Sequence, residues 1–136
     1  MNRLQGLVLI FCIIFTTGFA LGKAPSKIVF SEHPITPETF EYNMDTFKIK
    51  QRIYYAIHMP KGFKDDFIRI QLIKKDELSE FWGYKIYYSK DVEVPIGKKF
   101  YHDYLNIGEK GVYVMQVMEF RNLNSPIARG LFGVTE

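Results

Sequence analysis

Three histidines are the first side chains to consider for metal binding. His33, His58 and His102 lie in three separate segments of the chain. None has a second histidine two or four residues away, which is the spacing that brings two imidazoles to one metal ion. The pattern therefore favours no zinc or copper site, and we expect neither a metal nor a cofactor.

His102 and Asp103 are the one pair that resembles a catalytic dyad. Neighbouring residues on a strand point to opposite faces, so these two side chains cannot bond each other in a simple relay. No serine occurs in a G-x-S-x-G setting, and the only cysteine is Cys12. We therefore expect a protein that is not an enzyme, and rank a hydrolase third among the functional interpretations.

Acidic residues gather in two predicted loops, at Asp65-Asp66 and in residues 76–80. Calcium takes hard oxygen ligands in flexible geometry, so an extracellular calcium site is physically reasonable there. Neither run has EF-hand spacing, and solvated turns usually carry such residues. Glycoside hydrolysis needs two carboxylates about 5 to 10 Å apart across a cleft, and the sequence gives no reason to place these so.

Aromatic residues are in surplus, with 9 Tyr, 12 Phe and 1 Trp in 136 residues. Tyr54, Tyr87 and Tyr101 alternate with residues assigned to the core, so we expect them to face outward near lysines and arginines. Together with Trp82 they form the predicted ligand or partner surface, suited to a protein partner or to sugars by stacking. The ordinary alternative is that tyrosine is a good strand former on exposed sheet faces.

The first 22 residues have the pattern of a secretory signal peptide. Arg3 precedes an apolar block over residues 7–15, and small residues follow near the end. We expect cleavage after Gly22, with Ala20 as the second choice. An uncleaved anchor remains an alternative, although the block is short against the roughly 20 residues of a spanning helix. Cys12 lies within the block behind Phe11, which disfavours a lipoprotein.

Removal of 22 of the 136 residues leaves 114, residues 23–136, which is one domain. The remaining 17 basic and 15 acidic side chains are too balanced to indicate nucleic-acid binding. The domain has no cysteine, which excludes disulfides and thiol-ligated metals. Such an exported domain must be held by its hydrophobic core alone.

Short alternating segments separated by turns fill the rest of the chain. We predict strands at residues 28–30, 40–44, 47–59, 67–73, 82–88 and 100–105, and two or more beyond residue 111. Turn residues recur about every 8 to 12 positions, and no stretch keeps a helical period. The fold class predicted is all-β, a two-sheet antiparallel sandwich of seven to nine strands, preceded by the helix of the signal peptide.

The segment from Leu105 to Val117, LNIGEKGVYVMQV, places Tyr113 at the start of a late strand. A tyrosine there can turn back over the preceding corner and bond backbone through its hydroxyl. Met115 stands where antibody domains carry the cysteine of their inter-sheet disulfide. The G-x-Y-x-(apolar)-x-V run and the closing residues 126–134 resemble bacterial secreted immunoglobulin-like domains. The resemblance covers about the last thirty residues and implies a fold, with no named activity.

The function predicted is binding, outside the cytoplasm, in the periplasm, at the cell surface or secreted. The lead hypothesis is a protein-interaction subunit or accessory of a cell-envelope assembly, in contact with an envelope or extracellular protein or with a second copy of itself. The alternative is a carbohydrate-binding module that uses the exposed aromatics. Membrane contact is expected only if the leader stays uncleaved.

Overall fold

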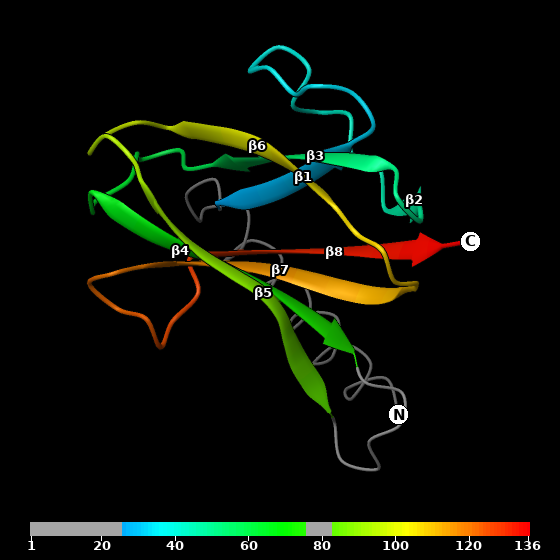
Figure 1. Cartoon of the computed structure of the whole chain (residues 1–136). Coiled ribbons are helices and arrows are strands. Elements are labelled where there is room, and N and C mark those ends of the chain that lie inside the picture. Colours follow the sequence, from blue (N-terminus) through cyan, green and yellow to red (C-terminus); the bar gives the residue numbers. More distant parts are fainter. Residues whose placement is uncertain (1–25, 76–82) are drawn as a thin grey trace, which may run out of the picture.

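The computed structural model describes residues 26–75 and 83–136 and contains eight strands in two layers (Figure 1). The strands are β1 (Lys27–Ser31), β2 (Thr46–Lys48), β3 (Arg52–His58), β4 (Phe67–Lys75), β5 (Tyr84–Glu93), β6 (Phe100–Asn106), β7 (Gly111–Glu119) and β8 (Ala128–Thr135). Within the described ranges no helix is long and apolar enough to cross a membrane. The predicted signal helix and Trp82 lie outside the described residues.

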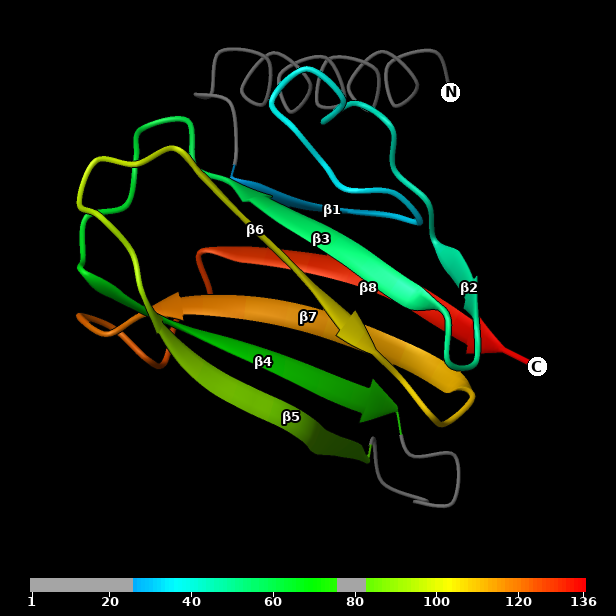
Figure 2. The same ribbon diagram turned by 45° about the horizontal axis from the view of Figure 1, so that its top comes forward.

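The two layers are a three-stranded and a five-stranded sheet, which Figure 2 shows one above the other. The first has the order β1-β3-β6 and is antiparallel throughout. The second has the order β2-β8-β7-β4-β5, antiparallel except that β2 runs parallel to β8. The two layers and the eight strands confirm the predicted immunoglobulin-like sandwich.

Alternating apolar residues from both sheets fill the space between the layers. Period-two alternation puts every second side chain of a strand on one face, so each sheet presents an apolar inner surface. β3, β4 and β7 supply most of it, and aromatic rings from β1, β2 and β8 complete it. The most completely buried members within the strands are Phe30, Phe47, Ile53, Tyr55, Ile57, Ile68, Ile70, Leu72, Tyr113, Met115, Val117 and Phe132, and Phe63, Val94 and Ile107 join them from the loops.

Tyr113 is the third residue of β7 and makes the corner contact that the sequence predicts. Its hydroxyl donates a 2.6 Å hydrogen bond to the carbonyl oxygen of Glu109, four residues upstream. Its ring is fully buried and stacks on Phe132 at 5.6 Å. Lys74 closes the corner from β4, with its ammonium group 2.8 Å from the Glu109 carboxylate. One side chain thus joins the β6–β7 turn to the core.

A segment of the chain itself covers the outer face of the three-stranded sheet. Residues 31–45 leave β1, cross over this face and return to β2 in the other sheet (Figure 1). Ile35 and Phe40 are inserted from this segment against Val29 and Ala56, which form a second, smaller core. This sheet therefore has apolar contacts on both faces.

The predicted strand at residues 40–44 is wrong, because this part of the covering segment forms turns. The Thr39 amide bonds the Thr36 carbonyl at 3.1 Å, and the Tyr42 amide bonds the Thr39 carbonyl at 3.2 Å. The alternating aromatic residues that predicted a strand do not share a buried face. Phe40 is inserted into the smaller core, whereas Tyr42 is 74% exposed.

The predicted strand at residues 47–59 is in fact two strands in different sheets. Lys50 adopts a left-handed conformation with φ of 66°, which ends β2 and redirects the chain into β3. Gln51 stabilises the turn: its side-chain oxygen accepts from the Lys48 amide at 2.9 Å, and its own amide bonds the Lys48 carbonyl at 3.1 Å. Gln51, the polar residue that interrupts the predicted apolar face, therefore lies in the turn between the two strands.

Candidate functional site

The structure does not bring the predicted aromatic surface together. Tyr54 lies on the outer face of the three-stranded sheet, as predicted, half-buried with its ring 5.9 Å from the Tyr104 ring. The Arg52 guanidinium lies over the Tyr104 ring at 4.3 Å, and its hydrogen bond to Tyr54 raises the pKa of this arginine. This outward arrangement contains Tyr104, a residue that the prediction did not include.

Tyr101 was predicted to face outward, and this is wrong. It lies on the inner face of β6, with its ring 6.4 Å from the buried Tyr55 ring. Strand β6 reads FYHDYLN and carries aromatic residues at both phases of the alternation, so the pattern alone does not say which set faces the core. Pairing with β3 decides it, because Tyr101 stands opposite Ile57.

Tyr87 was also predicted to face outward, and it instead contacts the core. A bulge between β4 and β5 leaves Tyr87 without a partner, since Leu72 pairs with Tyr88 and Ile73 with Ile86. An extra residue in one strand reverses its alternation beyond that point. The Tyr87 ring therefore meets the Tyr113 ring edge-on at 5.4 Å. By the same reversal Ile86, assigned to the core from the sequence, lies outside and is 58% exposed.

His102 and Asp103 face opposite sides of β6, as strand geometry requires. The His102 ring lies 5.6 Å from the Phe100 ring on the outer face. Asp103 points inward and accepts a 2.7 Å hydrogen bond from Lys90 of β5, which joins the two sheets along their shared edge. Burial by itself would raise the pKa of Asp103, but the hydrogen bonds from Lys90, the Tyr104 amide and Tyr101, together with the charge of Lys90, outweigh it and lower this pKa.

Lys90 and Asp103 form a structural ion pair across the sandwich. Burial would lower the pKa of Lys90, but the bond to Asp103, together with the charges of Asp103 and the neighbouring Tyr101 and Tyr88, outweighs burial and raises this pKa. Tyr101 adds a contact of 3.4 Å from its hydroxyl to the same carboxylate, and burial raises the pKa of that hydroxyl. Both charges are satisfied within the fold, so the cluster offers no free acid or base for a reaction.

Edge strands are a second place where a partner could bind, because their outer N–H and C=O groups can accept another strand. In β1 the outward groups of Phe30 are occupied: its amide donates to Asn43 at 2.9 Å, and its carbonyl accepts from Met44 at 2.8 Å. In β2 the Gln51 turn occupies both groups of Lys48. Both edges on this side of the sandwich are therefore capped by their own chain.

The opposite edges, β5 and β6, carry other obstacles to strand addition. In β6 the carboxylate of Asp103 accepts from the Tyr104 amide at 2.8 Å. In β5 the bulge at Tyr87 distorts the edge, and Lys90 directs a charge inward. Bulges and inward-facing charges are devices that natural sheets use against edge pairing. Addition of a partner strand is disfavoured at all four edges.

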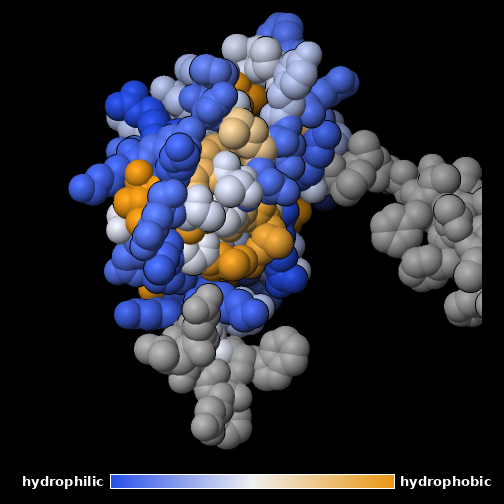
Figure 3. All heavy atoms as spheres, turned by 90° about the vertical axis from the view of Figure 1, so that its right-hand side faces the viewer, coloured by the Kyte–Doolittle hydropathy of each residue, from blue (hydrophilic) through white to orange (hydrophobic). Residues whose placement is uncertain are grey.

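The outer face of the five-stranded sheet remains open among the described residues, and a line of aliphatic side chains crosses it. Leu131 of β8 stands opposite Val114 of β7, Val114 opposite Ile73 of β4, and Ile73 opposite Ile86 of β5. We call these four residues the apolar row. Leu131 and Ile86, at its two ends, are 60% and 58% exposed. In Figure 3, which looks onto the right-hand end of the sandwich in Figure 1, apolar side chains reach the surface among hydrophilic ones.

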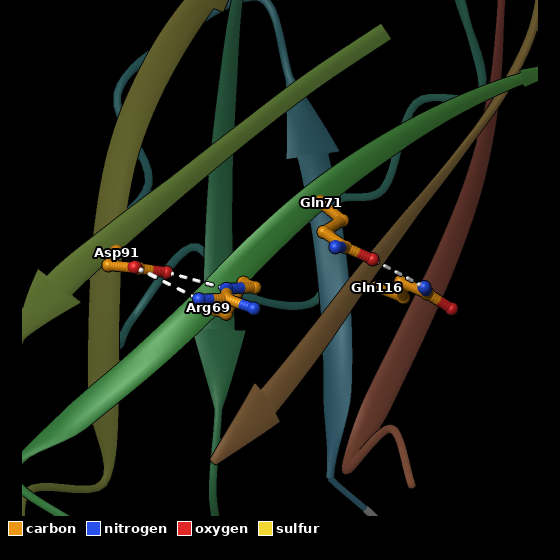
Figure 4. A network of polar contacts seen from close by, with 4 residues as sticks. All are labelled: Arg69, Gln71, Asp91 and Gln116. Atoms are coloured by element: carbon orange, nitrogen blue, oxygen red, sulfur yellow. Dashed lines mark hydrogen bonds and ion pairs between the residues drawn. The ribbon is translucent and has the colours of Figure 1, made fainter. Parts of the chain in front are cut away.

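Polar residues flank the apolar row on the side toward the β7–β8 turn. Gln116 donates to Gln71 at 2.9 Å, and Arg69 holds Asp91 with hydrogen bonds of 2.8 and 3.2 Å (Figure 4). The bond to Asp91 raises the pKa of the guanidinium, and the bond to Arg69 lowers the pKa of the carboxyl. These pairs span β7, β4 and β5 and keep the outer face ordered. A rigid apolar line beside satisfied polar groups is suited to contact with another macromolecule.

Sequence reasoning missed the apolar row for an identifiable reason. Its members lie on four strands, and only the register of three strand pairs places them side by side. The available signal was that β7 reads VYVMQVM, with apolar residues at both phases. A strand with one solvated face would carry polar residues at one of the phases.

Comparison with known proteins identifies a fold and no family. No family model matches the chain, and no curated protein is similar to it. The soluble domain of PmoD from Methylocystis sp. ATCC 49242 is similar in structure, with a TM-score of 0.53 at 14% identity, over 85% of this chain and 94% of that one.

Two further solved structures align less well. One is an immunoglobulin-like protein from Pseudomonas aeruginosa, with a TM-score of 0.47 at 10% identity over 83% of this chain and 94% of that one. The other is a superoxide reductase from Ignicoccus hospitalis, with a TM-score of 0.46 at 12% identity, over 82% of this chain and 81% of that one. Identities this low concern the fold alone, and the fold is compatible with a binding or accessory domain.

Proposed function

We propose that this protein is an exported, non-enzymatic protein-interaction domain that binds its partner through the outer face of the five-stranded sheet. The observation that carries the proposal is the apolar row, which crosses four adjacent strands with both ends more than half exposed. Aliphatic side chains at such positions gain free energy only when another surface covers them.

The contrast between the two outer faces supports this assignment. Residues 31–45 cover the outer face of the three-stranded sheet with Ile35 and Phe40. The corresponding face of the five-stranded sheet has no such cover among residues 26–75 and 83–136. Because the edge strands are also obstructed, this face is the apolar surface we assign to the partner among the described residues.

Burial of this face would contribute free energy to the binding of a partner. Fully burying a Leu or Ile side chain is worth about 1.5–3 kcal/mol, and Leu131 and Ile86 each have more than half of their surface still to lose. A partner that covers these side chains gains this burial free energy. The two glutamines and Arg69 would lie at the rim, where they give orientation.

The setting we propose is an assembly of the cell envelope, in the periplasm or at the cell surface. Residues 1–22 support it through their signal-peptide pattern, and the cysteine-free domain is consistent with stability that does not depend on the redox state of its surroundings. Carbohydrate binding has less support, because Tyr54, Tyr87 and Tyr101 lie in three different places.

Isoleucine-to-lysine substitutions test the proposal with a matched control. Ile86→Lys places a charge in the apolar row, whereas Ile96→Lys changes a residue of similar exposure, 68% against 58%, in the β5–β6 loop. Both variants should keep the melting midpoint of the wild type. In co-purification from an envelope fraction, Ile86→Lys should lose a partner that both the wild type and Ile96→Lys retain. Equal recovery by the two variants would refute the assignment of the face.

A further inference from the structure

We infer that the partner on this face is a second copy of the same chain, packed sheet against sheet about a two-fold axis. The inference rests on the proposed function, since it names the occupant of the same face. It is argued from three rows of residues, which the strand register places parallel to one another across β8, β7, β4 and β5.

The second and third rows flank the apolar row. The row two residues toward the β6–β7 turn contains Gly133, Val112, Lys75 and Tyr84. The row on the other side contains Arg129, Gln116, Gln71 and Ser89, two residues along β8, β7 and β4 and three along β5, where the bulge at Tyr87 adds a residue. We call these the glycine row and the glutamine row. In each row the residue on β8 differs from the residue on β5 in size or in charge. Two copies of the face can therefore be compared for a match between large and small, or between charged and neutral, side chains.

A two-fold axis along the strands, between β7 and β4, preserves the order of the rows. It places β8 of one copy over β5 of the other, and β7 over β4. Leu131 then meets Ile86 of the second copy, and Val114 meets Ile73, so the apolar rows cover each other along their whole length. Two facing sheets pack about 10 Å apart with their strands within about 30°, which brings such side chains into contact.

Size is complementary in the glycine row. Gly133, which has no side chain, falls under Tyr84 of the second copy, and Tyr84 is 54% exposed in the single chain. The notch at Gly133 is not required by the fold: a Cβ there would have nothing closer than 3.9 Å. A strand interior normally disfavours glycine, and close approach of another surface is one reason to find it there.

Charge is complementary in the glutamine row. Arg129, which is exposed, falls over Ser89 of the second copy, and Asp91 lies two residues further along the same strand. The Asp91 carboxylate already accepts from Arg69 and remains 43% exposed, so it can accept from a second guanidinium. The same axis places Gln116 over Gln71, whose amides can pair in either direction. The two-fold axis brings no two like charges into the same position.

The area sets the strength of the contact. Four strands at about 4.8 Å and three rows at about 6.8 Å give a planar footprint of roughly 400 Å² on each copy. This is below the roughly 800 Å² per partner of a standard stable interface. We therefore expect a reversible dimer with a dissociation constant in the micromolar range, measurable by sedimentation equilibrium of the full-length chain.

Cysteine cross-linking tests the arrangement directly, because Cys12 is the only cysteine and can be replaced in a Cys12→Ser background. Leu131→Cys mixed with Ile86→Cys should cross-link through a short bifunctional thiol reagent. Each variant alone should cross-link at least about tenfold less, because the axis keeps two copies of position 131 about three strand spacings apart. Efficient cross-linking of either variant with itself would overturn the proposed axis.

A size exchange tests the glycine row. Gly133→Tyr should weaken self-association at least about fivefold, because its ring would clash with Tyr84 of the second copy. Adding Tyr84→Ala to the same chain should restore most of the affinity. In the double variant the large side chain lies on β8 and the small one on β5, so a large residue again faces a small one across the interface. Since a Cβ fits at position 133, the melting midpoint should stay near that of the wild type. Weakening without rescue would overturn the pairing of Gly133 with Tyr84.

The outcomes separate this inference from the proposed function. A chain that stays monomeric at several hundred micromolar overturns the inference. If Ile86→Lys then still loses a partner that Ile96→Lys retains, the face is an interface for a different protein, and the proposed function stands. If the chain is monomeric and the two lysine variants behave alike, both are overturned.

Discussion

Removal of the Tyr113 hydroxyl tests the physical basis of the fold. In Tyr113→Phe the ring keeps its stacking on Phe132 and its edge-on contact with Tyr87, so the substitution deletes only the 2.6 Å bond to the Glu109 carbonyl. A hydrogen bond of this kind contributes about 1 kcal/mol net, and up to about 2 kcal/mol when its acceptor is left without a partner. For a domain of this size the melting midpoint should fall by about 5 to 10 °C.

Alkaline pH provides an internal check on the same contact. Burial, followed by the nearby Tyr87 and the Glu109 carboxylate, raises the pKa of Tyr113 to about 12 from its ordinary value of 10.0. A raised folded-state pKa means that the contribution is complete below pH 10 and is lost as the pH rises through 12. The stability difference between wild type and Tyr113→Phe should therefore be constant from neutral pH to pH 9 and shrink above pH 10.

Urea unfolding followed by tryptophan fluorescence or circular dichroism measures this difference. Tyr42→Phe is the matched control, because Tyr42 is 74% exposed and loss of its hydroxyl should change the unfolding free energy by less than about 0.5 kcal/mol. If Tyr113→Phe and Tyr42→Phe unfold at the same urea concentration as the wild type, the corner bond contributes nothing, and our account of this turn is wrong.

Two further predictions concern the sandwich edge and one turn. Asp103→Asn should cost about 1 kcal/mol at neutral pH, because the pair with Lys90 is partly exposed, at 31% and 29%. Because the folded-state pKa of Asp103 is lowered, the difference in unfolding free energy between the wild type and Asp103→Asn is complete above pH 3.8 and disappears as the pH falls further. If the unfolding free energies of the two proteins do not converge in acid, this prediction is wrong. Gly62→Ala should cost more than about 2 kcal/mol, since φ is +77° and an added Cβ would lie 2.5 Å from the Gly97 carbonyl oxygen. A melting midpoint within 2 °C of the wild type, measured by calorimetry, would show that this turn relaxes.

Much of the architecture follows from local chemistry that the sequence displays. Alternation in residues 67–73 and 111–117 identified two central strands and the faces they bury, because period two is a property of one strand alone. The corner at Tyr113 was also readable, since the turn, the tyrosine and its acceptor lie within five residues.

The functional surface depended on contacts between distant segments. The bulge that removes Tyr87 from the pairing arises between β4 and β5, and it moved Ile86 from the predicted core to the outside. The face that Tyr101 occupies was ambiguous in a strand with aromatics at both phases, and the pairing with Ile57 decided it. No local pattern carries this information.

The sequence by itself determined that the chain forms a sandwich of short strands, because hydrophobic alternation and turn residues act over a few positions. Only the tertiary structure decided which apolar residues stay outside. Leu131, Val114, Ile73 and Ile86 are up to 58 positions apart and become a single row through the register of three strand pairs. Register is set by the packing of the whole inner face, so the surface it creates exists only in the folded protein.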